Sequence, residues 1–268
     1  MYIILSDDTT GLRIGEGHQI TLAAYADDII IIGETEEDLK RMAEKLIMSR
    51  REQVQNPLVV GGFTFERVSN FKYLGVDVNQ QANSHEEIKR RITAGNKSYF
   101  ALVPVFKLKL ISKNTKIRLY KVLIRPIVLY ACGAWPSTKS DEKRLLLFER
   151  KILRRIYRPK RNEENLYGRR TNAELRAIFN EPNIVGILKS RRISWAGHVW
   201  RAEGQTVHDV TMWKPNKKRP IGRPRQRWTD RVKEDLELLG IREGEQLAKN
   251  RELWRGVVEA AMELQGPE

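Results

Sequence analysis

The stretch ITLAAYADDIIIIG, residues 20–33, decides how the first part of this chain folds. It holds two β-prone runs, 20–24 and 29–32, which flank the adjacent acids Asp27 and Asp28. Short apolar runs on either side of turn-forming residues are typical of paired strands. We therefore predict a β-hairpin in this stretch, with both acids at its tip.

The adjacent acids are candidates for metal chemistry. Neighbouring side chains on a regular strand point to opposite faces, so Asp27 and Asp28 can reach one site only where the backbone reverses. Nucleotidyl transfer uses two divalent cations about 3.5–4 Å apart, and carboxylates must bridge them. The alternative is a solvated turn of two Asp residues without chemistry.

The elements beyond this hairpin change in character along the chain. Residues 36–49 have the apolar spacing of a helix, 58–65 read as a second hairpin around Gly-Gly, and 71–78 is a third strand candidate. Beyond Asn83 the apolar period becomes helical, with prolines such as Pro104 marking predicted boundaries. The predicted helices span 84–102, 113–130, 140–157, 171–179, 184–200, 226–239 and 245–264.

Charge separates the same two parts of the chain. Residues 1–83 carry 8 Lys and Arg against 13 Asp and Glu, a net charge of −5, whereas the other 185 residues carry 41 against 21, a net charge of +20. A chain with this balance favours a polyanionic partner, and nucleic acid is the leading class. The cations are spread over many elements and interleaved with acids, which disfavours the rival interpretation of a membrane-surface protein.

Cysteine and histidine usage excludes several kinds of site. Cys132 is the single cysteine, so the chain has no intrachain disulfide and no Cys-based zinc finger. The four His residues lack HExxH spacing. We find no secretory signal and no apolar run of membrane-spanning length, so we expect an intracellular protein, nuclear or cytoplasmic, with no membrane partner.

The residues Tyr25, Ala26, Asp27 and Asp28 form the YxDD pattern of reverse transcriptases, and further motifs follow in the order expected for one family. Together they resemble the C-terminal part of the reverse transcriptase, an RNA-directed DNA polymerase, of LINE-type (non-LTR) retrotransposons. Phe71, Lys72, Tyr73, Leu74 and Gly75 look like that family's primer-grip strand. The segments similar to its thumb and C-terminal region are 124–135, 148–157, 192–199 and 222–228.

The resemblance implies a role for each matched position. Asp27 would be a ligand to Mg²⁺ or Mn²⁺, and Asp28 would support the catalytic site. Tyr25 and Ala26 would lie beside the primer terminus and the incoming nucleotide, and residues 71–75 would position the primer's 3′ end. The implied partners are an RNA template and a DNA primer or target.

The chain also departs from the family pattern. A second metal-binding Asp on an earlier palm strand has no clear counterpart, because Asp7 and Asp8 precede Thr9, Thr10 and Gly11 in what reads as a turn. The fingers and a Lys that acts as general acid in the family are also unmatched. We therefore expect no polymerase activity from this chain alone.

The expected fold is α+β. Residues 1–83 would form a partial polymerase palm of antiparallel hairpins plus a helix, 84–160 a helical thumb, and 161–268 a basic helical extension. Residues 214–227 hold three prolines and seven basic residues without an acid, which predicts an extended linker. Helical spacing predicts that Trp195, Trp200 and Trp228 are core residues.

Nucleic acid would bind to basic residues of the helical part. Their phosphate contacts would add affinity and salt dependence, although a solvated helix face is the alternative for each residue taken singly. The candidates are Arg90, Arg91, Lys97, Lys113, Lys116, Arg118, Arg223, Arg225 and Arg227. The rival function is that of a non-enzymatic nucleic-acid-binding protein derived from a mobile element, with YADD as a relic.

Overall fold

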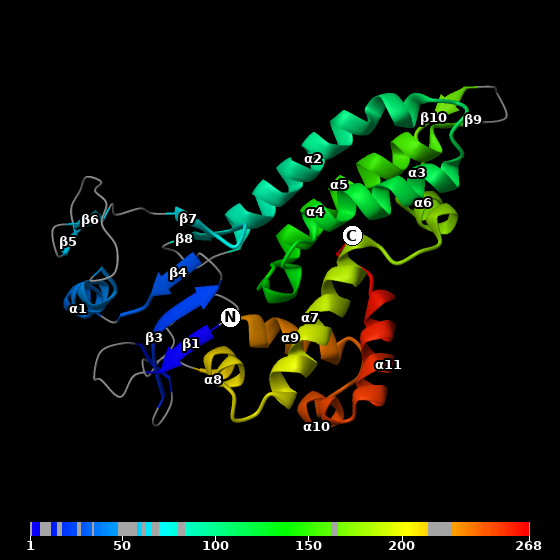
Figure 1. Ribbon diagram of the computed structural model, residues 1–268. Helices are drawn as coiled ribbons and strands as arrows, with labels where there is room; N and C mark the ends of the chain where they lie inside the picture. The colour runs from blue at the N-terminus through cyan, green and yellow to red at the C-terminus, as the bar shows by residue number, and fades with distance from the viewer. Residues whose placement is uncertain are drawn as a thin grey trace. The chain divides into compact units, whose positions relative to one another are not determined.

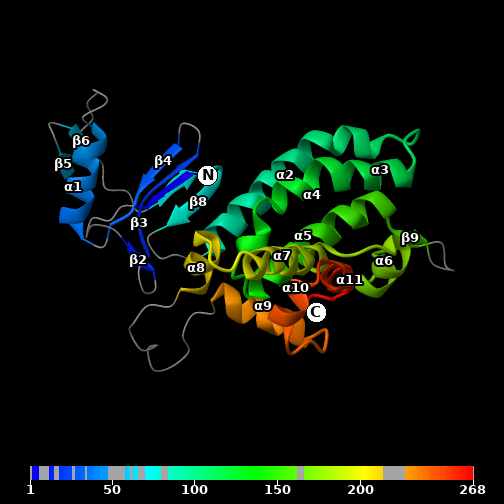
Figure 2. The same cartoon turned by 60° about the horizontal axis from the view of Figure 1, so that its bottom comes forward.

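The computed structural model divides the chain into two units, residues 1–82 with 203–217 and residues 83–202 with 218–268. Strands dominate the first unit and helices the second (Figures 1 and 2). The described residues are 2–5, 12–14, 18–25, 28–33, 35–47, 58–60, 63–65, 70–79, 84–161, 166–213 and 227–267. The chain is therefore α+β, as its sequence predicts.

The first unit is built on a four-stranded antiparallel sheet in which β3 pairs with each of the other strands. Its strands are β1 (Tyr2–Leu5), β2 (Leu12–Ile14), β3 (His18–Tyr25) and β4 (Asp28–Ile31). In the β3–β4 pair Tyr25 lies opposite Asp28. This register confirms the hairpin predicted from residues 20–33.

Smaller elements complete the first unit. Strands β5 (Leu58–Val60) and β6 (Phe63–Phe65) form the predicted second hairpin. Helix α1 (Glu36–Ile47) is also confirmed, and it buries Met42 and Ala43. Helix α8 (Thr206–Met212) was not predicted from the sequence.

The stretch 71–78 is a hairpin, so the prediction of a single strand there is wrong. Strand β7 (Asn70–Tyr73) pairs antiparallel with β8 (Val76–Asn79), with Tyr73 opposite Val76. Leu74 and Gly75 between them have φ values of 46° and 77°. Two successive positive φ values match the twist of paired strands, and they place Leu at a position that usually takes Asn or Gly.

The second unit consists mainly of helices. They are α2 (His85–Lys107), α3 (Lys113–Leu119), α4 (Arg125–Val128), α5 (Lys139–Tyr157), α6 (Asn172–Phe179), α7 (Ile184–Arg201), α9 (Trp228–Glu237), α10 (Gly244–Lys249) and α11 (Arg251–Met262). A π-helical turn, η1 (Tyr120–Ile124), and a 3₁₀ turn, η2 (Cys132–Ala134), lie between α3 and α5. The short strands β9 (Lys160–Arg161) and β10 (Tyr167–Gly168) pair after α5.

Three predicted helix boundaries are wrong. Pro104 lies inside α2, which continues to Lys107. The helix predicted over 113–130 is interrupted by the wider turn η1, so α3 and α4 are separate. The helix predicted over 245–264 breaks at Asn250, whose side chain accepts hydrogen bonds from the first backbone N–H groups of α11.

Two clusters of buried side chains form the core of the helical unit. The larger includes Ile88 of α2, Leu145 of α5 and Leu188 of α7, so helices on both sides of residue 160 share it. The smaller joins α7, α9, α10 and α11. Trp200 and Trp228 pack against the smaller cluster as predicted. Trp195 does not belong to this cluster, and 39% of it is exposed.

Close backbone approach fixes how α7 meets the C-terminal helix. The Trp254 ring covers Gly197 so closely that a Cβ there would lie 2.0 Å from the indole nitrogen. A Cβ on Gly186 would lie 2.1 Å from the carbonyl oxygen of Met262. Further along, a Cβ on Gly266 would lie 2.7 Å from Leu146. These glycines let α7 and α5 pack directly against the last residues of the chain.

The N-terminus of α7 is tied to α5 by a buried carboxylate. Glu149 accepts hydrogen bonds from the Tyr120 hydroxyl at 2.8 Å and from the Ile184 N–H at 2.9 Å. Burial raises the pKa of Glu149 above its ordinary value. The contact nevertheless satisfies one of the backbone donors that a helix leaves free at its start.

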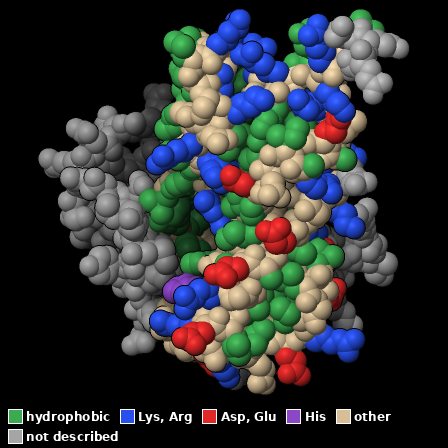
Figure 3. All heavy atoms as spheres, turned by 90° about the vertical axis from the view of Figure 1, so that its right-hand side faces the viewer, with side chains coloured by type: hydrophobic (Ala, Val, Ile, Leu, Met, Phe, Trp, Pro, Cys, Tyr) green, Lys and Arg blue, Asp and Glu red, His purple; other side chains and the backbone are tan. Residues whose placement is uncertain are grey.

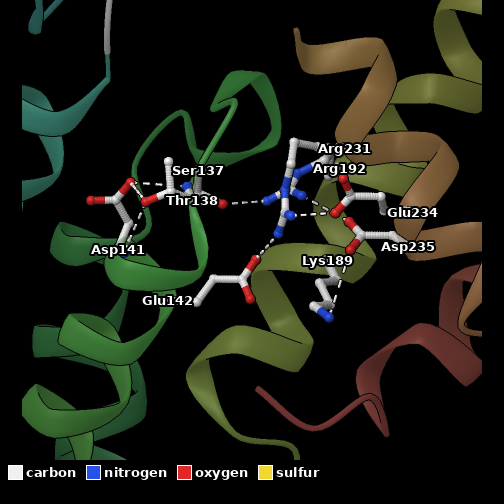
Figure 4. A network of polar contacts seen from close by, with 9 residues as sticks. All are labelled: Ser137, Thr138, Asp141, Glu142, Lys189, Arg192, Arg231, Glu234 and Asp235. Atoms are coloured by element: carbon white, nitrogen blue, oxygen red, sulfur yellow. Dashed lines mark hydrogen bonds and ion pairs between the residues drawn. The ribbon is translucent and has the colours of Figure 1, made fainter. Parts of the chain in front are cut away.

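A buried ionic network joins α5, α7 and α9 (Figure 4). Arg192, which is 0% exposed, donates from Nη1 to Asp235 at 2.9 Å and from Nη2 to Ser137 at 2.7 Å. Arg231 donates to Glu142 and to Glu234. The Lys189 ammonium lies 3.6 Å from the second oxygen of Asp235. Three cations thus face three carboxylates in the helix interface.

Desolvation dominates the electrostatics of this network. It lowers the pKa of Arg192 and raises the pKa of Asp235, although each group stabilises the charge of the other. Buried ion pairs add little net stability over an apolar replacement. Removing only one partner is costly, because the other charge remains buried without compensation. Each charged residue of the network is therefore needed for stability as long as its ionic partner remains buried.

We predict that Arg192→Leu lowers the free energy of unfolding by about 3–5 kcal/mol, because Asp235 would remain buried without its main partner. The measurement is urea unfolding followed by circular dichroism. The matched control is Lys160→Leu, which breaks the exposed Lys160–Glu174 pair and should cost less than about 1 kcal/mol. Equal losses in the two variants would contradict the prediction.

Candidate nucleic-acid interface

The predicted catalytic turn lies only partly within the described residues. The backbones of Tyr25 and Asp28 face each other across the β3–β4 hairpin. Ala26 and Asp27, the predicted metal ligand, lie outside the described residues. Elsewhere in the described part of the chain, no group of three or more His, Cys, Asp or Glu side chains could hold a metal ion.

The residues predicted to position the primer lie on the β7–β8 hairpin. Phe71 and Leu74 are exposed, as is Lys72, and Val78 of the partner strand adds to this apolar surface. Tyr73 is less accessible, and its hydroxyl is buried without a hydrogen-bond partner among the described residues. The tip of this hairpin therefore presents apolar side chains beside one cation.

Half of the predicted basic residues that the structure describes in α2 and α3 are occupied by other contacts. Arg90 and Arg91 both bond to the buried Glu87, and the Arg91 guanidinium stacks 4.3 Å from the Tyr130 ring centroid. Lys116 is 4% exposed, and its ammonium donates to the Leu108 carbonyl at 2.7 Å. These cations stabilise helix ends and helix packing.

The remaining predicted basic residues are scattered. Lys97, Lys113 and Arg118 are exposed. Arg227 precedes α9 and is half-buried, with its backbone N–H donating to Asp230. Arg223 and Arg225 lie outside the described residues. The predicted set is thus not brought together into one site.

The structure instead gathers cations in a hollow between α2 and α5, which we call the basic hollow. It has a volume of about 690 Å³, and its lining has six Lys or Arg side chains and, among the described residues, no acid. The lining residues are Tyr99, Phe106, Lys107, Leu147, Lys151, Arg154, Arg155, Arg158, Pro159 and Arg169. In Figure 3 Lys and Arg side chains gather toward the top of the view, and most of the acids lie lower.

Helical spacing on α5 produces most of this hollow. Lys151, Arg154, Arg155 and Arg158 recur at intervals of three and four residues and so share one face. The opposite face buries residues such as Ile152 and Ile156 in the core. The periodic cations within KILRRIYR, residues 151–158, are the signal that could have identified this site from sequence.

Neutral partners and like charges surround Arg154 at the edge of the hollow. It donates to the Arg170 carbonyl at 3.2 Å and to the Asn172 side chain at 2.6 Å. Burial, followed by repulsion from Arg169 and Arg150, lowers the pKa of Arg154. The described neighbours thus concentrate positive charge without neutralising it, as a site for a polyanion requires.

A second hollow extends the first along the same two helices. It has a volume of about 460 Å³ and shares Leu147 and Lys151 with the basic hollow. Its other lining residues are Lys89, Ile92, Thr93, Asn96, Arg144 and Phe148. We call the two together the α2–α5 groove. Phe100 lies beside it, 60% exposed, with the Lys151 ammonium 5.3 Å from its ring centroid.

No helix among the described residues is long and apolar enough to cross a membrane. The cations that line the α2–α5 groove make it the principal candidate interface of the helical unit. Its chemistry combines cations with exposed apolar side chains, a combination found in proteins that bind nucleic acid strands.

Comparison with known proteins bears on the origin of the chain. It is 24% identical over 274 residues to a Caenorhabditis elegans protein named as transposon-derived, and the match covers 90% of this chain and 96% of the relative. No protein-family model and no solved structure matches the chain. The similarity supports an origin in a mobile genetic element.

Proposed function

We propose that the chain is a reverse transcriptase fragment of a retrotransposon, and that its helical unit binds template and primer through the α2–α5 groove. The observation that carries the binding role is the basic hollow, with its six cations and no described acid. The YADD motif and the transposon-derived relative support the reverse transcriptase origin. Mg²⁺ or Mn²⁺ would bind at Asp27.

Phosphate chemistry explains why this hollow suits a nucleic acid. Each phosphate that a Lys or Arg neutralises releases condensed counterions, so affinity depends on salt. Arg side chains also form two parallel hydrogen bonds to one phosphate. The groove also offers the exposed Leu147 between the cations, which sugars and bases can contact.

The rival function, a non-enzymatic nucleic-acid-binding protein derived from a mobile element, uses the same groove. The two functions differ only at the YADD hairpin, where the first requires a metal ligand and the second does not. The presence of the complete YADD motif supports the first, because adjacent acids can share a metal site where the backbone reverses.

The groove should control nucleic-acid affinity. We predict that the double variant Lys151→Gln, Arg155→Gln weakens binding of a 20-base-pair RNA–DNA hybrid by roughly tenfold or more, because two phosphate contacts are lost. The salt dependence should also fall, with the slope of log K against log salt concentration smaller by about 1.5–2. Fluorescence anisotropy with a labelled hybrid measures both quantities.

A matched control distinguishes binding at the groove from binding that follows the net charge of the chain. Lys249→Gln, Arg255→Gln removes two exposed cations from α10 and α11, away from the groove lining. This variant should bind with nearly wild-type affinity. If both double variants lose affinity equally, binding follows overall charge and the groove is not the interface.

The metal-dependent role has its own test. We predict that this polypeptide alone extends no primer on an RNA template with Mg²⁺, because Asp7 and Asp8 precede Thr9, Thr10 and Gly11 and are poor matches for the second palm carboxylate. It should still bind a deoxynucleoside triphosphate in an Mg²⁺-dependent way, and Asp27→Ala should abolish that binding. Unchanged binding in Asp27→Ala would favour the non-enzymatic alternative, and Asp27-dependent synthesis would contradict the expected inactivity.

A further inference from the structure

Arg158 ends α5 in a backbone conformation that side chains rarely adopt. Its φ is 62° and its ψ is 167°, a region that is occupied almost only by glycine. The conformation is held from both sides, because the Arg158 N–H donates to Arg154 and its carbonyl accepts from Arg170 at 2.9 Å. Glycine at this position would make the same backbone contacts without the strain.

The backbone therefore does not explain why arginine and not glycine occupies this position, and the explanation must lie in the side chain. Arg158 is exposed and lines the basic hollow beside Arg155 and Arg169. Among the described residues its guanidinium has no carboxylate partner and no hydrogen-bond acceptor. The strained position thus places a fork-shaped donor, which no described carboxylate neutralises, in the lining of a cationic hollow.

Stabilisation of the helix end is a weaker explanation. Cations near a helix C-terminus interact favourably with its partial negative charge. Arg154 and Arg155 in the last turn of α5 already provide that interaction. A third cation in a strained position adds little to it.

We propose that Arg158 is a phosphate-binding residue of the basic hollow, and that its ligand is a phosphodiester group of a nucleic-acid strand. This inference rests on the proposed function and goes further, because it names one contact and the group bound there. The planar guanidinium can donate two hydrogen bonds to one phosphate. The neighbouring Lys and Arg residues would bind the phosphates on either side.

The test pairs affinity with stability in the full chain. Arg158→Gly should bind the labelled RNA–DNA hybrid roughly tenfold more weakly, with a salt slope smaller by about 0.7–0.9. The same variant should melt about 2–4 °C higher, because the strain is relieved. Arg158→Ala should lose the same affinity without the gain in melting temperature, since alanine keeps the strained conformation.

Ala131→Gly is the matched control, because Ala131 also has a positive φ, 55°, but carries no charge. It should melt higher and bind as the wild type does. Inorganic pyrophosphate, added at constant ionic strength, should displace the hybrid equally poorly from Ala131→Gly and from the wild type.

Three results would overturn the proposal. One is wild-type affinity and salt slope in both Arg158 variants. Another is a loss of stability without a loss of affinity in Arg158→Ala, which would assign Arg158 to the helix end. The third is efficient displacement by pyrophosphate, which would assign the hollow to a free anion. If the Lys151, Arg155 variant loses affinity but the Arg158 variants do not, the proposed function stands and only this inference fails.

Discussion

The ionic contact between Arg192 and Asp235 lies buried between α7 and α9, at the centre of the network that joins them to α5. Apolar side chains would hold α5, α7 and α9 together in many orientations, because hydrophobic contact is not directional. A hydrogen bond from a buried guanidinium is directional, and Arg192 donates from both Nη1 and Nη2. The same arrangement brings Arg231 to Glu142 on α5. The network therefore ties α5 to α9, and the cationic face of α5 follows from the helical spacing of its Lys and Arg residues.

Local sequence patterns predicted most of the helices and two of the hairpins. The hairpins around Asp27 and around Gly61 were predictable because apolar runs on either side of turn residues specify pairing without distant contacts. Some errors are local, such as the missed turn at Leu74 and Gly75, and others occurred where longer-range packing decides. Pro104 does not end α2, and Trp195 faces outward although its spacing matches that of buried neighbours. Whether a tryptophan is buried depends on which helix packs against it in the folded chain.

The candidate site was less predictable, because the identity of a cation does not reveal its partner. Lys116 and Arg91 look like surface charges in the sequence, yet a carbonyl group and a carboxylate occupy them. The basic hollow combines α5 with Lys107 of α2 and with Arg169, which lie far from it in the sequence. Only the packing of α2 against α5 creates it. The periodic cations on α5 could be predicted from the sequence, whereas the packing of α2 that encloses the hollow could not.

The contact of α7 with the final residues also governs when the chain can fold during synthesis. Gly186 and Gly266 are where helices made early meet backbone and side chains made late. The ribosome releases α2 and α5 long before Met262 and Gly266 emerge. Until then the apolar face of α7 that packs against α11 is uncovered. An early stop codon would therefore leave core residues of α7 exposed to solvent. Translation of this chain to residue 266 is thus a condition for a closed helical unit.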